Sequence, residues 1–124
     1  MKFKNFESLG KNRDFQRVYH NKRSFANKDL VMYISENSDF VDNNKNRLGI
    51  SVSKKVGNSV IRHHLCRLIR EAYRSNADQV INGYDIVVVV RSELNGKSYA
   101  DTEKALMHLL KKHKLLSNYA TSEG

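Results

Sequence analysis

Residues 47–72 read RLGISVSKKVGNSVIRHHLCRLIREA, and within them the hydrophobic period changes from two to between three and four. From residue 47 to 53 apolar and polar residues alternate, which predicts a strand with Leu48, Ile50 and Val52 on its inner face. The other face is expected to be open, and it carries Arg47, Gly49, Ser51 and Ser53.

From Ser59 to Ser75 the apolar residues recur at helical spacing, which predicts an amphipathic helix. A turn containing Gly57 separates this helix from the preceding strand. The predicted apolar stripe consists of Ile61, Leu65, Leu68, Ile69 and Ala72.

The remaining periodic segments complete one sheet and its helices. Alternation predicts a strand over Asp29–Glu36, and a β-branched, almost continuously apolar run predicts a strand over Tyr84–Val90 that is buried on both faces. Helical spacing predicts helices over Asn12–Asn21 and Tyr99–His113.

The predicted order is α, two or three strands, α, β, α, which with three strands is α-β-β-β-α-β-α. This order indicates an α+β fold in which helices pack on a small mixed sheet. We expect a single domain over residues 1–116, a polar loop at 38–46 and a flexible tail at 117–124.

The chain of 124 residues carries 22 Lys and Arg against 13 Asp and Glu, a formal net charge of +9. This balance favours a polyanionic partner, either nucleic acid or an acidic membrane surface. The longest apolar run, Ile86–Val90, is far shorter than the roughly 20 residues that span a bilayer. No apolar segment follows the first residues, and the single cysteine, Cys66, fits a reducing cytosol. We therefore expect a cytoplasmic protein.

One face of the helix at 59–75 is cationic. At about 100° per residue, six of its side chains fall within an arc of roughly 140°: Arg62, His63, Cys66, Arg67, Arg70 and Arg74. Lys54 and Lys55 precede the helix N-terminus, whose dipole and free N–H groups also attract phosphate. A solvated helix face is the competing interpretation, but only Glu71 interrupts the arc, so ion pairing within the helix does not explain the cluster. The pattern favours phosphate binding.

Three aromatic residues suggest a second surface. Phe15 and Tyr19 lie on the first predicted helix, and Tyr33 lies on the sheet face that also carries Ser51 and Ser53. Together they can form an aromatic floor for unpaired bases. The competing interpretation is ordinary packing of the helix on the sheet, which periodicity alone favours for Phe15.

Signals for a nucleotide or metal site are weak. Gly96-Lys97-Ser98 ends like a phosphate-binding loop, but Arg91 stands where the first glycine would be required. His63 and His64 point about 100° apart on a helix, so together with Cys66 they do not make a zinc site.

Signals for catalysis by the protein are equally weak. Cys66 lies beside Arg62 and Arg70, which can lower the pKa of a thiol, but no histidine or carboxylate arrangement supports a nucleophile. Asp78 and Asp85 are isolated carboxylates in the sequence, so no acid–base pair is expected.

Residues 47–60, together with Arg62 and residues 67–72, closely resemble the bacterial ribonuclease P protein component. The similarity extends to Asp14–Tyr19, which resembles the first helix of that family, and to Ser24–Asn27, which follows it. The resemblance implies a small α-β sandwich with a left-handed β-α-β crossover. Periodicity would not have indicated that hand, because about 98% of such connections are right-handed.

The same resemblance implies a function and its partners. In that family a catalytic RNA subunit removes the 5′ leader of precursor tRNA with the help of magnesium ions. The protein binds both RNAs and contributes no catalytic side chain. We expect it to bind no metal ion, cofactor or small-molecule substrate by itself, and not to bind a membrane. The family is thus one subunit of an endoribonuclease.

The resemblance also assigns site residues. Contacts with the RNA subunit are expected from Lys54, Lys55, Asn58, Arg62, His63, His64, Arg67 and Arg70. Contacts with the leader are expected from Phe15, Tyr19, Tyr33, Ser51 and Ser53. Three positions depart from the usual signature, because His63 stands for Asn, His64 for Arg and Cys66 for Lys.

Other classes of function fit less well. A structural RNA-binding protein, such as a ribosomal component, would share the basic helix without any role in cleavage. A reader of duplex DNA needs a second helix a short turn away, whereas here a strand follows. A membrane-surface protein needs large apolar residues beside the basic face, and only Tyr73 lies near its edge.

Overall fold

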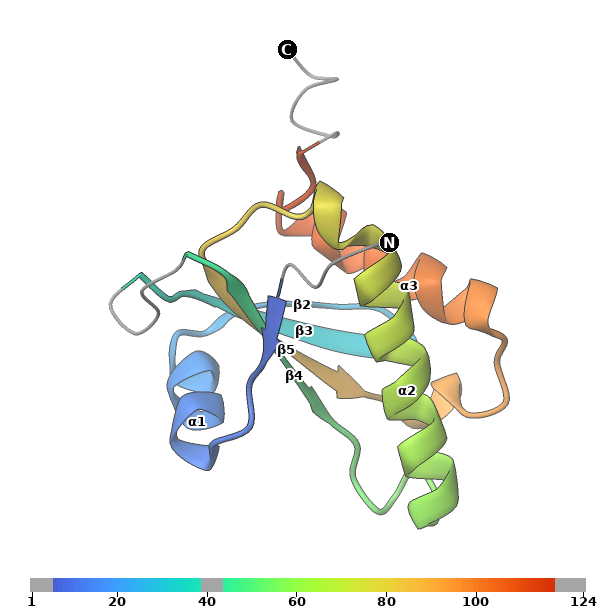
Figure 1. The fold of residues 1–124 in the computed structure, drawn as a ribbon. Coiled ribbons are helices and arrows are strands. Elements are labelled where there is room, and N and C mark those ends of the chain that lie inside the picture. The colour runs from blue at the N-terminus through green and yellow to red at the C-terminus, as the bar shows by residue number, and fades with distance from the viewer. Residues whose placement is uncertain (1–5, 39–43, 118–124) are drawn as a thin grey trace.

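The computed structural model describes residues 6–38 and 44–117, in which helices pack on both faces of one five-stranded sheet (Figure 1). The main elements, in chain order, are β1 (Phe6–Ser8), α1 (Asn12–His20), β2 (Arg23–Ala26), β3 (Leu30–Glu36), β4 (Asn46–Ser51), α2 (Ser59–Asn76), β5 (Tyr84–Val90) and α3 (Tyr99–Lys112). Two short 3-10 helices, η1 (Ala77–Gln79) and η2 (Ser92–Leu94), flank β5.

The predicted elements are present, with changes at their ends. The strand predicted over residues 47–53 is β4, which begins at Asn46 and ends at Ser51. Strand β1 was not predicted, because three residues are too few to show a period. Residues 39–43 of the expected loop and 118–124 of the expected tail lie outside the described residues. Ser117 is described, and its hydroxyl donates to the carbonyl of Gln79 at 3.1 Å.

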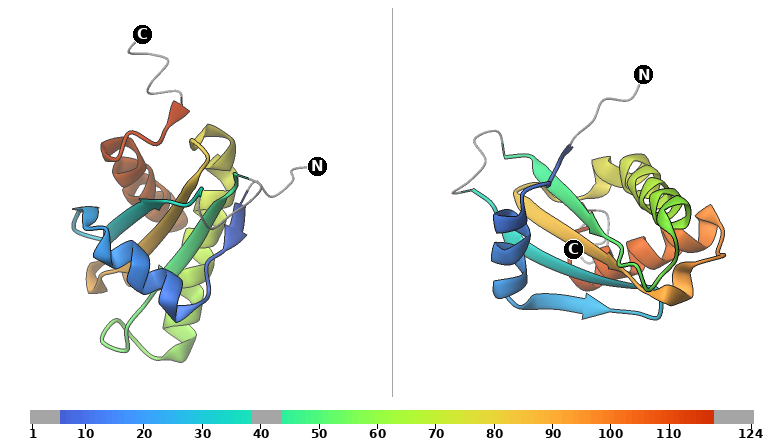
Figure 2. Two further views of the ribbon diagram at one scale, coloured as in Figure 1. Left: turned by 90° about the vertical axis from the view of Figure 1, so that its left-hand side faces the viewer. Right: turned by 90° about the horizontal axis from the view of Figure 1, so that it is seen from below.

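The sheet is mixed, with the strand order β1-β4-β5-β3-β2. Strand β4 is parallel to both β1 and β5, whereas β3 is antiparallel to β5 and to β2. The chain leaves β4, returns through α2 on one face of the sheet, and re-enters as the neighbouring strand β5. Followed through Figures 1 and 2, this connection is left-handed, as the family resemblance implied and against the usual rule.

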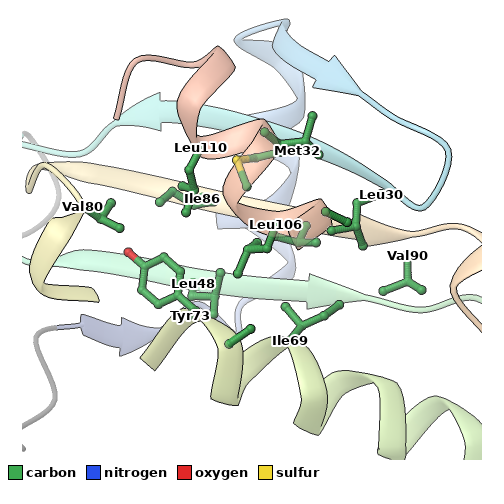
Figure 3. Close-up of a cluster of buried hydrophobic side chains, with 14 of the residues drawn as sticks. Leu30, Met32, Leu48, Ile69, Tyr73, Val80, Ile86, Val90, Leu106 and Leu110 are labelled. Carbon is green, nitrogen blue, oxygen red and sulfur yellow. The ribbon is translucent and has the colours of Figure 1, made fainter. Parts of the chain in front are cut away.

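The main core lies between the sheet and the pair α2 and α3 (Figure 3). Strand β5 runs through the centre of the sheet, and Ile86, Val87 and Val88 are fully buried. This confirms the prediction of a strand buried on both faces. The predicted stripe of α2 is confirmed at its centre, where Leu65 and Ile69 are buried.

Tyr73 belongs to this core, although its position in the sequence placed it near the basic arc. Its side chain is only 1% exposed, and its ring stands edge-on to Phe6 with 4.7 Å between the ring centroids. The Tyr73 hydroxyl accepts a hydrogen bond from Asn46 Nδ2 at 3.1 Å. Burial raises the pKa of Tyr73 to about 12. The unpredicted strand β1 supplies Phe6, so the sequence offered no partner for this tyrosine.

The prediction that the other face of the sheet is open is wrong. Helix α1 lies across that face (Figure 2). Val18 of α1 is fully buried against Leu9 and Val87. Gly49 lies directly beneath α1, and a Cβ at this position would be 2.6 Å from Phe15 Cζ. The helix can approach the sheet this closely because residue 49 has no side chain.

Candidate nucleic-acid interface

The turn between β4 and α2 presents two lysines and starts the basic helix. Lys54 and Lys55 are exposed, while Val56 between them and the helix is buried and anchors the turn. A Cβ on Gly57 would be 2.7 Å from Ile61 Cγ2, so the turn can pack against the helix only with glycine here.

Asn58 is the N-cap of α2. Its Oδ1 accepts a hydrogen bond from the backbone N–H of Ile61 at 3.0 Å, which satisfies one of the free donors of the first turn. The residue expected to contact RNA therefore also has a structural task, which the sequence pattern Asn-Ser before an apolar stripe signals by itself.

The predicted cationic face of α2 is present and points away from the core. Arg67 and Arg74 are exposed, and Arg62 and Arg70 are half-buried along the same side. Among the described residues, one carboxylate pairs with this face: Glu71 lies 4.0 Å from Arg67 Nε in an exposed pair. An exposed pair at that distance contributes little, so the face keeps its positive charge.

Arg62 is hydrogen-bonded to the turn that precedes α2. Its Nε donates to the carbonyl of Gly57 at 3.2 Å, which ties the guanidinium to the turn. His63 and His64 on the following positions are both exposed. The structure therefore brings these residues to one accessible surface with Lys54 and Lys55, while their contacts with RNA stay a prediction.

A small hollow of about 310 Å³ lies between α2 and β4. Its lining is apolar on the strand side and polar on the helix side, and consists of Ile50, Val52, Ser59, Arg62, His63 and Cys66. Burial raises the pKa of the Cys66 thiol, and the nearby Arg70 and Arg62 oppose that rise without reversing it. The lowered thiol pKa that the sequence suggested for Cys66 is therefore wrong, because desolvation of the half-buried thiol outweighs the two arginines.

The three aromatic residues expected to bind the leader come together on the α1 face. The rings of Tyr19 and Tyr33 meet edge to face with centroids 4.9 Å apart, and Phe15 lies 6.4 Å from Tyr19. All three are half-buried, since each packs on the small cluster of Leu9, Val18 and Val87. Each of the three side chains therefore packs on the sheet and is still partly accessible to solvent. Their stacking on bases of the leader stays a prediction.

The two serines of the expected leader surface lie in different settings. Ser51 is the last residue of β4 and is half-buried. Ser53 is exposed beyond the end of the strand, where its carbonyl accepts from the N–H of Val56 at 3.1 Å. The end of β4 thus has the leader surface on one side and the hollow beside α2 on the other.

Asp85 is fully buried at the centre of a polar network, although the sequence showed it as an isolated carboxylate. Arg47 binds it with two hydrogen bonds, from Nε at 2.8 Å and Nη2 at 2.7 Å, and Asn37 Nδ2 donates at 3.0 Å. Arg17 of α1 also donates to Asp85. Asp14 lies 3.7 Å from both arginines. An aspartate inside an apolar strand was the one signal in the sequence that could have indicated this network.

The charge of Asp85 is stabilised by these donors. Burial by itself would raise the pKa of Asp85, but the hydrogen bonds from Arg47, Asn37 and Arg17 outweigh it and hold the pKa below its ordinary value. The hydrogen bonds from Arg47 to Asp85 also raise the pKa of Arg47 against the opposing effect of its burial. The network fastens α1 to β4 and β5 and so sets the position of the aromatic residues on α1.

A groove of about 770 Å³ runs beside this network at the N-terminus of α1. It is bordered by Ser8, Gly10, Lys11, Arg13, Asp14, Arg17 and Arg47. Prediction from the sequence missed this groove, because β1 was not among the predicted elements.

Two kinds of site are absent from residues 6–38 and 44–117. No group of three or more His, Cys, Asp or Glu side chains in this part could hold a metal ion. No helix there is both long enough and apolar enough to cross a membrane.

Comparison with known proteins assigns the family. The sequence profile of the Ribonuclease P family matches residues 3–114. The chain belongs to the ribonuclease P protein family. The ribonuclease P protein component of Lachnoclostridium phytofermentans is 54% identical over 112 residues, which cover 90% of this chain and 93% of that protein.

Solved structures of ribonuclease P proteins share the fold. The protein from Staphylococcus aureus superposes with a TM-score of 0.79 at 36% identity, covering 88% of this chain and 96% of that one. The protein from Thermotoga maritima gives a TM-score of 0.75 at 31% identity, covering 86% and 96%. These similarities confirm the family and the fold that residues 47–72 indicated.

Proposed function

We propose that this chain acts as the protein subunit of ribonuclease P. It binds the catalytic RNA subunit and the 5′ leader of precursor tRNA, and so assists endonucleolytic removal of the leader. The observation that carries the proposal is the cationic face of α2. Arg62, Arg67 and Arg70 line it, and the one ion pair on it among the described residues joins Arg67 to the exposed Glu71 at 4.0 Å. Relatives that cover nearly the whole chain carry the name of this subunit.

The two surfaces have separate tasks in this proposal. The face of α2, with Lys54 and Lys55, holds phosphates of the RNA subunit through charge. The aromatic residues of α1 and β3 stack on unpaired bases of the leader. Because the two surfaces border the end of β4 from opposite sides, one small protein can contact the RNA subunit and the substrate together.

The chemistry belongs to the RNA in this proposal. The catalytic RNA and its magnesium ions cleave the phosphodiester bond, and the protein raises affinity and orients the leader. We place the complex in the cytoplasm, where precursor tRNA is processed. No membrane and no small-molecule substrate take part.

Cleavage of precursor tRNA by a matching ribonuclease P RNA, at low magnesium with and without this protein, tests the proposal. The protein should lower the magnesium needed for cleavage. A structural RNA-binding protein would bind the RNA and leave the cleavage rate unchanged, and that result would reject the role proposed here.

The RNA-subunit surface is tested by the salt dependence of binding. Each of Arg62→Ala, Arg67→Ala and Arg70→Ala should weaken binding and reduce the slope of log K against log[salt] by about 0.7 to 0.9. Lys104→Ala is the matched control, because Lys104 is an exposed cation on α3 away from this face. An unchanged slope in all three arginine variants would refute the assignment.

The leader surface is tested by comparing two substrates. Tyr19→Ala in the reconstituted holoenzyme should weaken binding of precursor tRNA by roughly 5-fold or more, the loss of one stacked base, and leave mature tRNA binding almost unaltered. Tyr19→Leu keeps an apolar side chain against Val18 and serves as the control for packing. Equal losses for both RNAs would favour a purely structural role for Tyr19.

A further inference from the structure

A second basic surface lies at the opposite edge of the sheet from β1. Strand β2 lies at the end of the strand order (Figure 2). Its four residues are all exposed. Together with the C-terminal end of α3 it borders a hollow of about 260 Å³. We name as the edge patch the residues Lys22, Arg23, Phe25, Lys112 and Lys114, which line this hollow.

The positive charge of the edge patch is not neutralised. None of its four cations forms an ion pair with a carboxylate within residues 6–38 and 44–117. Arg23 instead lies over the ring of Tyr84 at 5.9 Å, and Lys112 Nζ lies 5.0 Å from the centroid of Phe25. Four unpaired cations on one edge are an electrostatic surface for a polyanion.

Two of these lysines occupy backbone positions that favour glycine. Lys22 follows α1 with φ 61°, and Lys114 follows α3 with φ 62°, both in the left-handed region. Attraction to the helix C-terminus offsets part of this strain for a lysine. The chain nevertheless places a cation at both helix ends that flank the hollow, where glycine fits the backbone better.

Phe25 adds an accessible ring to these charges. Its side chain is 41% exposed, and it is the only aromatic among the exposed large hydrophobic residues of the described chain, Phe25, Val60 and Ile81. One edge of the ring is supported by His113, with 4.7 Å between centroids. A supported, exposed aromatic ring surrounded by cations is the arrangement that binds single-stranded nucleic acid without sequence preference.

The register of the sheet connects the edge patch to the proposed leader surface. Ser24 of β2 is the partner of Tyr33, and Phe25 is the partner of Met32 on the next position. Successive side chains of a strand point to opposite faces. An RNA strand that passes Tyr33 and crosses the single strand β2 therefore reaches Phe25 on the far side.

We propose that the edge patch binds the part of a long 5′ leader that extends beyond the nucleotides held at Tyr19 and Tyr33. The ligand is single-stranded RNA of the substrate, with phosphates on Lys22 and Lys114 and one base on Phe25. The inference rests on the proposed function. Cations on and beside an edge strand also prevent edge-to-edge pairing of sheets, and this alternative predicts no effect on RNA binding.

The test uses the reconstituted holoenzyme and two precursor tRNAs. One has a leader just long enough to fill the α1 face, and the other is longer by about 6 nucleotides, within the range of single-strand binding sites. Phe25→Leu keeps apolar packing on His113 and removes the stacking ring. The double variant Lys22→Gly/Lys114→Gly removes two charges at positions where glycine suits the backbone, so the fold is retained.

Each variant should weaken binding of the long-leader substrate about 5-fold or more and change binding of the short-leader substrate less than about 2-fold. The double variant should also lower the salt slope with the long leader alone. Lys104→Ala should show no dependence on leader length. Losses of equal size with both leaders would place the effect in the RNA subunit or the fold, and would overturn the inference, as would no loss with the long leader.

Tyr19→Ala separates this inference from the function it rests on. If Tyr19→Ala weakens both substrates while the edge variants weaken neither, the leader surface on α1 stands and the edge patch fails. If Tyr19→Ala weakens neither substrate, the proposed leader surface itself fails.

Discussion

Replacement of Asp85 by asparagine tests whether a buried charge holds α1 on the sheet. Asp85 is fully buried, and it accepts hydrogen bonds from Arg47, Asn37 and Arg17. The substitution Asp85→Asn keeps the shape of the side chain but presents an NH2 group toward donors in place of one carboxylate oxygen. The two arginines then lose the charge that compensates them.

The expected loss follows from the burial of this network. Removing one partner of a buried ion pair costs about 3 to 5 kcal/mol, because the remaining charge stays desolvated and uncompensated. Asp14 makes only the longer contacts of 3.7 Å to the same arginines and is partly exposed, so Asp14→Asn should cost less than about 1 kcal/mol. Against a typical stability of about 5 to 15 kcal/mol, the Asp85 loss is large and the Asp14 loss is small.

Urea unfolding followed by circular dichroism measures the free energy of unfolding of both variants and of the wild type.

The difference in the free energy of unfolding between the wild type and Asp85→Asn also depends on pH. Since the folded-state pKa of Asp85 lies below its ordinary value of 3.8, the stabilisation is fully present above that value and is lost as the pH falls through the folded-state pKa. The difference in the free energy of unfolding should therefore stay constant from pH 7 to about 4 and decrease only below that pH. Equal losses for Asp85→Asn and Asp14→Asn at pH 7 would refute the reasoning.

Three further perturbations have outcomes that the structure specifies. Gly49→Ala places a Cβ 2.6 Å from Phe15 Cζ, so it should destabilise the protein by about 1 to 3 kcal/mol and weaken leader binding, whereas Gly10→Ala, with open space around it, should do neither. Asn58→Ala removes the N-cap of α2 and should cost about 1 kcal/mol by thermal unfolding, while the neutral cap Asn58→Ser should retain the stability; a loss of RNA affinity in Asn58→Ser would show a contact beyond capping. Burial holds the pKa of His113 below 6.5, so the stability of the wild type should fall from pH 7 toward the lower folded-state pKa, and this slope should be shallower in His113→Gln; parallel curves would contradict the burial of a neutral imidazole.

The cationic face of α2 could be recognised without a structure because it depends on local geometry alone. A helix places every third or fourth residue on one side, so Arg62, Arg67 and Arg70 had to share a face once the segment was helical. The central strand β5 was equally recognisable, because a β-branched run of this length is buried wherever it lies. The family signature in residues 47–72 then supplied the crossover hand, which no local pattern contains.

The failures concern contacts between segments that are distant in the chain. Strand β1 has three residues and no period, yet it provides Phe6, which makes Tyr73 a core residue. Gly49 follows the alternation of an open strand face, but α1 arrives there from a distant part of the chain and covers it. Asp85 is isolated over its own neighbourhood and becomes the centre of a network only because Arg17 and Arg47 come from other elements.

The amino-acid sequence alone thus determined the three helices and the strands β3, β4 and β5, the charged face and the family, since each depends on the residues and spacing within one segment. Tertiary structure alone decided which polar residues are buried, which aromatic rings remain accessible, and that β2 with the end of α3 forms a second basic edge. Those properties depend on which segments pack together, and packing joins residues whose separation along the chain carries no periodic signal.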